Sequence, residues 1–168
     1  MRTRVKSFTP EDLLAELARQ GIKTTTVTHP ALFTVEDSQR LRGNIPGGHC
    51  KNLFLKDEKG ALFLLVALED AVITLNQLHK RVGCKRLSFG KPDLLMAVLG
   101  VTPGSVSPFA LINDHERRVT VLLDAAMLTH EQLSYHPLTN TMTTTLARVD
   151  LMVFLNGLGY QPRTIDLV

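Results

Sequence analysis

The sequence predicts an α/β domain of the α+β type, built on a mixed or mostly antiparallel sheet flanked by helices. Two observations predict this fold: apolar runs of strand length alternate with helical patterns, and the strands mostly follow one another through short hairpin turns. Hairpins make neighbouring strands antiparallel, so a doubly wound parallel sheet is not expected. The 168 residues, 44% of them hydrophobic, are enough for one domain with a real core, and we expect a single domain over residues 1–168.

The chain is predicted to begin with a helix and a strand. Thr9 can cap a helix that Pro10 begins and Gly21 ends, because apolar residues recur at helical spacing between them. The elements expected next are a strand rich in β-branched residues, a short helix and an irregular glycine-rich loop, at 24–28, 33–38 and 42–49.

Two strands joined by a tight turn are expected at the centre of the sheet. Residues 50–56 and 61–68 are apolar runs, and the turn 57–60 between them is typical of a hairpin. The second run is apolar on both faces, which predicts a central position. The other apolar patterns predict helices from about Thr74, from Pro92 and around 151–158, and strands at 109–112, 119–123, 134–137, 142–146 and 165–167.

Composition excludes several classes of protein. No apolar run approaches the roughly 20 residues that span a bilayer, and the basic residues 1–6 are followed by no apolar segment of a secretory signal, so we expect a cytosolic protein without a membrane partner. The net charge of +3 permits a nucleic-acid partner without requiring one. Cys50 and Cys84 have no metal-type spacing and are expected to be reduced. The six histidines are scattered, so neither a metal site nor a cofactor is expected.

The loop 99–114 is the stretch around which the rest of the chain is expected to be organised. Gly100 and Gly104 allow a ligand to approach the backbone, and Pro103 and Pro108 restrict the loop's alternatives. The amides of 104–107, which include those of Ser105, Val106 and Ser107, are expected to be free to bind a polar group or an oxyanion. The alternative is a tight helix-to-strand connection without a ligand.

Two further segments carry residues that could do chemistry. Lys51 and Asn52 open an apolar strand, and an inward lysine needs a partner or a ligand, unless it reaches water from a frayed strand end. Ideal alternation sends the two side chains to opposite faces, so a shared site requires either a bulge or a contribution from the backbone of one of them. His136 stands in a segment rich in hydroxyl groups and could bind a ligand, relay a proton or simply cap a turn.

Together these segments resemble the YbaK/prolyl-tRNA-synthetase editing-domain superfamily of aminoacyl-tRNA deacylases, above all its freestanding prolyl-tRNA editing members. The resemblance rests on four stretches in order along nearly the whole chain: Cys50-Lys51-Asn52-Leu53-Phe54-Leu55-Lys56-Asp57, the stretch 100–108, His136-Pro137-Leu138-Thr139-Asn140-Thr141-Met142-Thr143, and the ending 154–167. It implies a curled mixed sheet. The family's G-x-x-x-P loop falls on Gly104 to Pro108.

The resemblance implies hydrolysis, without metal or covalent nucleophile, of alanine wrongly joined to the tRNA for proline. Alanine is smaller than proline, so a tight pocket can admit the first and exclude the second. Water attacks with help from the ribose 2′-hydroxyl, and prolyl-tRNA synthetase is a possible partner. The implied residues are Lys51, Asn52, Gly104, Ser105 and His136 for catalysis, Gly100, Val106, Ser107, Pro108, Thr139 and Asn140 for the substrate, and Lys56 and Arg86 for the tRNA.

Two alternatives remain open from the sequence. The same fold could remove cysteine, serine or threonine instead of alanine, because pocket volume decides that choice. The chain could also be a non-catalytic module that binds tRNA or a synthetase.

Overall fold

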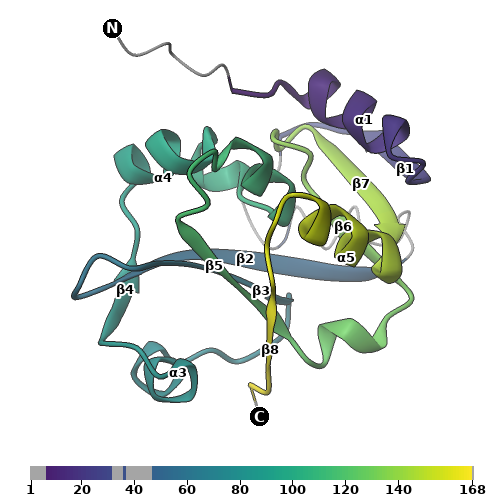
Figure 1. Cartoon of the computed structure of the whole chain (residues 1–168). Coiled ribbons are helices and arrows are strands. Elements are labelled where there is room, and N and C mark those ends of the chain that lie inside the picture. The colour runs from purple at the N-terminus through teal and green to yellow at the C-terminus, as the bar shows by residue number, and fades with distance from the viewer. Residues whose placement is uncertain (1–6, 32–35, 37–46, 168) are drawn as a thin grey trace, which may run out of the picture.

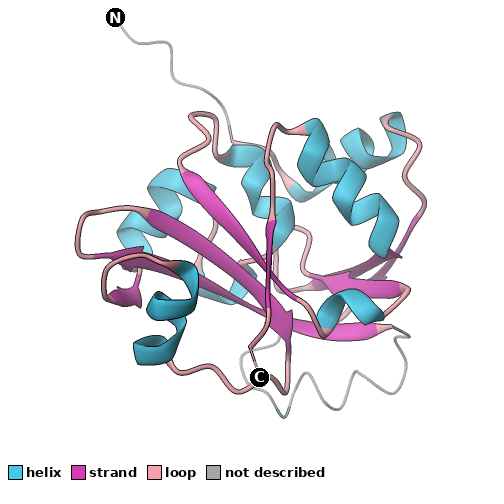
Figure 2. Cartoon of the chain, turned by 60° about the horizontal axis from the view of Figure 1, so that its bottom comes forward, coloured by secondary structure: helices cyan, strands magenta, loops and turns pink. Residues whose placement is uncertain are grey.

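A computed structural model describes residues 7–31, 36 and 47–167, which form a mixed eight-stranded sheet with helices on both faces (Figures 1 and 2). The strands are β1 (Thr24–Thr28), β2 (Gly48–Asp57), β3 (Leu62–Leu68), β4 (Leu87–Phe89), β5 (Val119–Asp124), β6 (Gln132–Tyr135), β7 (Met142–Ala147) and β8 (Arg163–Ile165). The helices are α1 (Pro10–Arg19), α3 (Leu75–Val82), α4 (Pro92–Leu99) and α5 (Arg148–Gly157), with 3-10 turns η1 (Pro103–Ser105), η2 (Pro108–Asn113) and η3 (Met127–Thr129).

The strand order is β1-β7-β6-β2-β3-β5-β8, and β4 pairs with the far end of β2. Pairing is antiparallel for β1–β7, β6–β7, β2–β3 and β2–β4, and parallel for β2–β6, β3–β5 and β5–β8. The predicted mixed sheet flanked by helices is therefore confirmed. The hairpins β2–β3 and β6–β7 are also confirmed, whereas β5 and β8 join the sheet through crossovers that contain helices.

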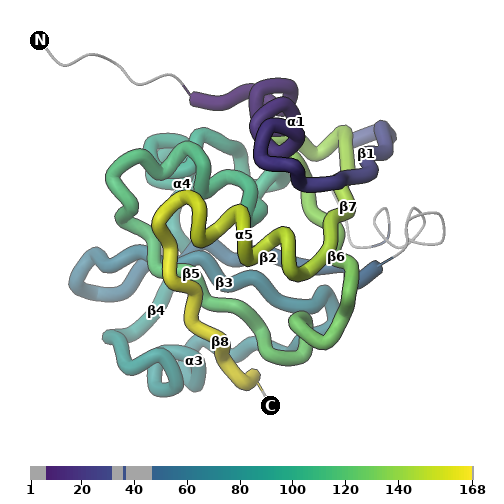
Figure 3. Tube along the Cα trace, turned by 45° about the vertical axis from the view of Figure 1, so that its right-hand side comes forward, coloured from purple at the N-terminus to yellow at the C-terminus, as the bar shows by residue number. Residues whose placement is uncertain are grey.

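Two cores lie on opposite faces of the sheet. The larger core packs buried side chains of α1, α4, α5 and η2 against one face, and the smaller packs α3 against the other. Figure 1 shows α1, α4 and α5 on one side of the strands and α3 on the other, and Figure 3 shows α5 crossing the sheet. Strand β3 supplies Leu64 and Val66 to the larger core and Phe63 and Leu65 to the smaller. Its predicted central position is confirmed.

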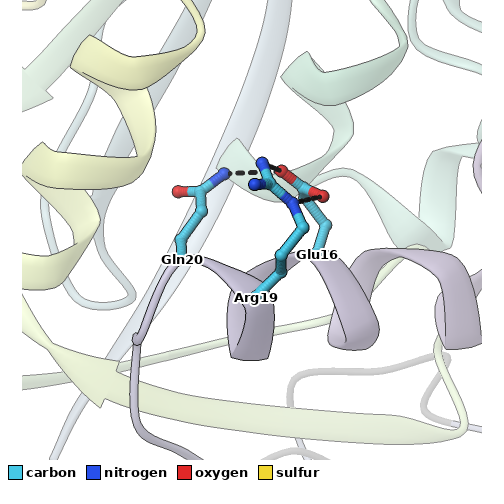
Figure 4. A network of polar contacts seen from close by, with 3 residues as sticks. All are labelled: Glu16, Arg19 and Gln20. Atoms are coloured by element: carbon cyan, nitrogen blue, oxygen red, sulfur yellow. Dashed lines mark hydrogen bonds and ion pairs between the residues drawn. The ribbon is translucent and has the colours of Figure 1, made fainter.

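Helix α1 begins as its sequence predicts. The Thr9 side chain accepts a hydrogen bond from the Asp12 amide, and the Asp12 carboxylate accepts one from the Thr9 amide, both at 3.1 Å. On the exposed side, Glu16 forms an ion pair with Arg19 and accepts a hydrogen bond from Gln20 at 3.0 Å (Figure 4). These two hydrogen-bond donors lower the pKa of the Glu16 carboxyl to about 2.

The stretch 109–112 was predicted to be a strand, and this prediction is wrong: the residues lie in the 3-10 helix η2. Pro108 fixes a helical φ at its first position, and the Ser107 hydroxyl accepts a hydrogen bond from the Phe109 amide at 3.2 Å. The run is wholly apolar because η2 passes through the larger core. The three-residue strand β4 was missed, since it is too short to show an alternating pattern.

The other differences concern the ends of elements. Strand β2 begins at Gly48, two residues before the prediction, and the final strand ends at Ile165 instead of extending to Leu167. The helix expected over 33–38, apart from residue 36, and most of the loop expected over 42–49 lie outside the described residues. No helix in the described ranges is long and apolar enough to cross a membrane.

Candidate active site

The candidate site lies where the parallel strands β2 and β6 stop pairing. Their last paired positions are Gly48 with Leu133 and His49 with Ser134. Lys51 follows His49 by two residues, and His136 follows Ser134 by two residues. Lys51 and His136 therefore each lie two residues beyond the last paired position, on strands that run in the same direction. Paired β-strands lie about 4.8 Å apart.

Lys51 has a partner within the protein. Its Nζ donates a hydrogen bond to the carbonyl oxygen of Ala71, in the connection that follows β3. The register of β2 with β3 runs without interruption, with Lys51 opposite Ala67 and Asn52 opposite Val66, so no bulge lies there. Lys51 and Asn52 consequently point to opposite faces of β2. A common site would have to use the strand's backbone or the open edge where β2 and β6 separate.

Asn52 holds a buried polar atom without a partner. Its Oδ1 is inaccessible to solvent and accepts no hydrogen bond, a situation found for no other side-chain nitrogen or oxygen in the described part of the chain. Asn52 shares its face of β2 with Phe54, which packs in the larger core together with Val106 and Phe109. A buried acceptor left unpaired costs about 1–3 kcal/mol, and a ligand that donates a hydrogen bond to it would recover that energy.

The loop between α4 and η2 is a defined pair of turns. One expectation for it is wrong: the Ser105 amide is not free, because it donates to the Thr102 carbonyl at 2.9 Å and closes η1. Among the described residues, no hydrogen bond is found for the amides of Gly104, Val106 and Ser107. Three of the four predicted donors are therefore unused within the protein, but only Gly104 is exposed, whereas Val106 is 9% exposed and Ser107 is fully buried.

The loop meets the histidine segment at Gly104. A Cβ built on Gly104 would lie 3.5 Å from Nδ2 of Asn140. The structure thus brings together two stretches that are separated by more than thirty positions in the sequence. Gly104 is exposed, whereas Pro108 is buried, and Thr139 is half-buried, with its hydroxyl 3.0 Å from that of Thr141.

Gly100 has a structural role in this loop. It ends α4 in the left-handed conformation, with φ +67°, and a Cβ there would lie 2.9 Å from Nδ2 of Asn113. The Asn113 side chain in turn donates to the carbonyl of Leu99 at 3.0 Å and accepts from the amide of Phe8 at 2.7 Å. This close approach, rather than a ligand, accounts for the glycine.

His136 is held by its own segment. Its Nδ1 lies 2.9 Å from the carbonyl oxygen of Met142, and its ring centroid is 6.1 Å from that of His29. A carbonyl only accepts hydrogen bonds, so Nδ1 carries the proton, and Nε2 is left as an acceptor. Burial, with a smaller contribution from His29, lowers the pKa of His136 below its ordinary value of 6.5, although the bond to Met142 opposes this shift. The ring is therefore neutral at pH 7.

The two predicted tRNA contacts lie at the other end of β2. Lys56 is opposite Ser88 of β4, and the exposed Arg86 immediately precedes that strand. By strand alternation, Lys56 shares the face of Asn52 and lies four residues away, or roughly 13 Å at the rise of a β-strand. Lys56 and Arg86 can therefore reach a part of a ligand well removed from the reacting group.

The chemistry that the site can offer is hydrogen bonding. Burial raises the pKa of the Cys50 thiol to about 12, which keeps it protonated at neutral pH and makes it a poor nucleophile. The described residues contain no group of three or more His, Cys, Asp or Glu side chains that could hold a metal ion. The sequence analysis did not single out His29, which directly follows the strand predicted over 24–28. The available signal was a histidine placed just before a proline at that strand end.

This arrangement of a mixed sheet, a G-x-x-x-P loop and a neutral histidine has a counterpart among known proteins. The sequence profile of the aminoacyl-tRNA editing domain matches residues 29–154, and the chain belongs to that family. The chain is 37% identical over 159 residues, 91% of its length and 86% of the relative's, to the "Prolyl-tRNA synthetase associated domain-containing protein 1" of Danio rerio.

Other relatives agree with this class. The chain is 32% identical to the "Prolyl-tRNA editing protein ProX" of Acetoanaerobium sticklandii, over 92% of this chain and 95% of that one. A crystal structure described provisionally as a trans-editing enzyme for prolyl tRNA synthetase superposes with a TM-score of 0.71 over 94% of this chain and 96% of that one. At 19% identity, that likeness supports the fold alone.

Proposed function

We propose that this chain is a cytoplasmic trans-editing deacylase that hydrolyses the ester between alanine and the tRNA for proline. Membership of the editing family and the names of the prolyl-tRNA relatives support the reaction class. The single observation that carries the proposal is the close approach of Asn140 to Gly104, where a Cβ would lie 3.5 Å from the Asn140 Nδ2. The unpaired acceptor of Asn52 supports it.

Each group has a role in this proposal. The free amides of Gly104, Val106 and Ser107 hold the ester carbonyl or the ribose end, where negative charge develops as water attacks. The Asn52 Oδ1 accepts a hydrogen bond from the aminoacyl end, and the Nε2 of His136 accepts another. Water is the nucleophile, and the ribose 2′-hydroxyl assists it. Alanine leaves as the free acid, and the ribose oxygen of the ester bond recovers a proton.

Lys51 has a more restricted role than its charge suggests. Its ammonium is already bound to the Ala71 carbonyl, so we propose that it positions β2 at the site and exchanges this carbonyl for a tRNA phosphate when the substrate binds. Lys56 and Arg86 bind the acceptor end further from the ester. Such phosphate contacts add affinity with little dependence on base sequence.

A panel of mischarged tRNAs tests the proposal. The chain should release alanine from the tRNA for proline much faster than it releases alanine from a tRNA of another acceptor sequence. Preferred release of cysteine, serine or threonine from the same tRNA would contradict the assignment of alanine and leave the reaction intact. Tight binding without release of any amino acid would show a non-catalytic module and refute the proposal.

A further inference from the structure

His29 forms hydrogen bonds to the segment that carries His136, through its backbone and through its buried imidazole. His29 follows β1 and is only 8% exposed. Its backbone amide donates to the Thr141 carbonyl at 2.9 Å, which extends the pairing of β1 with β7 by one residue. Its Nε2 lies 2.8 Å from the Thr143 hydroxyl. His29 is thus hydrogen-bonded to Thr141 through its main chain and to Thr143 through its ring.

The residue between these two anchor points is Met142, whose carbonyl oxygen is the partner of His136 Nδ1. The position of that carbonyl is therefore set from both sides by His29. A shift of the Met142 carbonyl would remove the acceptor that keeps the His136 proton on Nδ1. It would also let the proton move to Nε2, the nitrogen that the proposed reaction needs as an acceptor.

The state of the His29 ring is itself fixed by the backbone. Its Nδ1 lies 2.8 Å from the Pro30 carbonyl oxygen, which can only accept, so the proton is on Nδ1. In the neutral ring, Nε2 is then an acceptor, and the Thr143 hydroxyl donates to it. Both imidazoles carry their proton on Nδ1, and their centroids are 6.1 Å apart with the planes tilted by 55°.

We propose that His29 is a positioning residue of the editing site, which holds the Met142 carbonyl so that His136 presents an unprotonated Nε2 to a hydrogen-bond donor of the aminoacyl ester. This inference rests on the proposed function only for the identity of that donor. The coupling between His29 and His136 is a property of the free protein.

The test combines two measurements on the full chain and its variants. Imidazole nitrogen chemical shifts, followed by NMR against pH in the histidine-labelled protein, give the tautomer and the pKa of His136. Steady-state hydrolysis of Ala-tRNA(Pro) gives kcat and KM. The variants are His29→Gln, which removes the ring, and Thr143→Val, which removes only the hydroxyl. His115→Gln, a change at an exposed histidine elsewhere, is the matched control.

In the wild-type protein, the His136 proton should be on Nδ1. In His29→Gln, we expect a mixture of His136 tautomers and a kcat lower by about tenfold or more with little change in KM, because misplaced catalytic groups are costly. Thr143→Val should show smaller changes in the same direction and keeps the test available if His29→Gln fails to fold.

The inference would be overturned if the imidazole nitrogen chemical shifts of His136 were unchanged in both His29→Gln and Thr143→Val. It would also be overturned if the control His115→Gln changed these chemical shifts as much as the two variants do. If the wild-type protein hydrolyses no aminoacyl-tRNA, the proposed function fails. The NMR comparison still decides whether His29 positions His136, so the two failures are distinguishable.

Discussion

Nδ2 of Asn140 lies 3.5 Å from the position that a Cβ on Gly104 would occupy. This separation is an ordinary van der Waals contact, and Gly104 does not have the positive φ that would itself demand glycine. A single methyl group on Gly104 would therefore fit beside Asn140 without displacing it. The contact sets a size limit at the point where the two proposed halves of the site meet.

Substitutions at Gly104 should have graded effects. Gly104→Ala should keep most of the deacylation activity, whereas the two Cγ atoms of Gly104→Val should displace Asn140 and lower kcat/KM by about tenfold or more. Thermal unfolding should change little in either variant, because Gly104 is exposed. Wild-type rates for Gly104→Val would show that the loop is only a connector.

A substitution at Lys51 can remove the charge of the side chain while keeping its packing. Lys51→Met keeps the aliphatic stem and removes the hydrogen bond to the Ala71 carbonyl. We expect a strong loss of deacylation, with a free energy of unfolding lowered by no more than about 3 kcal/mol, the upper end for a hydrogen bond that involves a charged group. Urea denaturation and single-turnover rates measure the two effects. An unchanged rate would remove Lys51 from the site.

The pH dependence should follow His136. Because burial lowers its pKa below 6.5, the active neutral form should persist down to that pH, and the rate should fall only at lower pH. Stability should change with the same sign. Between 6.5 and the lowered pKa, the unfolded chain binds a proton that the folded chain does not, so the free energy of unfolding decreases as the pH falls. In His136→Gln, this part of both profiles should disappear.

Two cations at the far end of β2 should control affinity for the tRNA. The double variant Lys56→Gln/Arg86→Gln should weaken binding of deacylated tRNA and reduce the dependence of the dissociation constant on salt, because fewer counterions are released. The rate at saturating substrate should stay near that of the wild-type protein. Lys23→Gln, just before β1, serves as the control. If both variants bind equally well at all salt concentrations, the assignment of these two residues is wrong.

A buried tyrosine provides a test of stability that should leave function untouched. The Tyr160 hydroxyl donates to the Asp114 carboxylate at 2.6 Å, and the same carboxylate accepts the amides of Arg118 and Val119 at 3.1 and 3.0 Å. Tyr160→Phe should lower the free energy of unfolding by about 1.5–3 kcal/mol, as expected for a hydrogen bond to a charged group. Deacylation under stabilising conditions should be unchanged, and a large loss of kcat would contradict this separation.

The sequence predicted most strands and helices because their patterns are local. Thr9 and Pro10 mark the start of α1, and the β2–β3 turn is recognisable from four residues. The error at 109–112 arose because an apolar run is compatible with either a strand or a buried helical turn, and the Ser107 cap that decides between them is weak in sequence.

The site could be predicted only in part. The structure places Asn140 close to Gly104 and joins His29 to Thr143 by a hydrogen bond. Both relationships depend on how distant strands are ordered in the sheet, which no local sequence pattern encodes. The partner of Lys51 was equally hidden, since Ala71 contributes only a backbone carbonyl. The regular register at Lys51 and Asn52 had been left open, and the structure excludes a bulge there.

The most direct test of the central claim compares two amino acids on one tRNA. Single-turnover hydrolysis of Ala-tRNA(Pro) and of Pro-tRNA(Pro) should be measured with the wild-type chain under identical conditions. The account predicts rapid release of alanine and a rate for proline close to spontaneous hydrolysis. Equal rates for the two amino acids, or no release of alanine above the spontaneous rate, would contradict it.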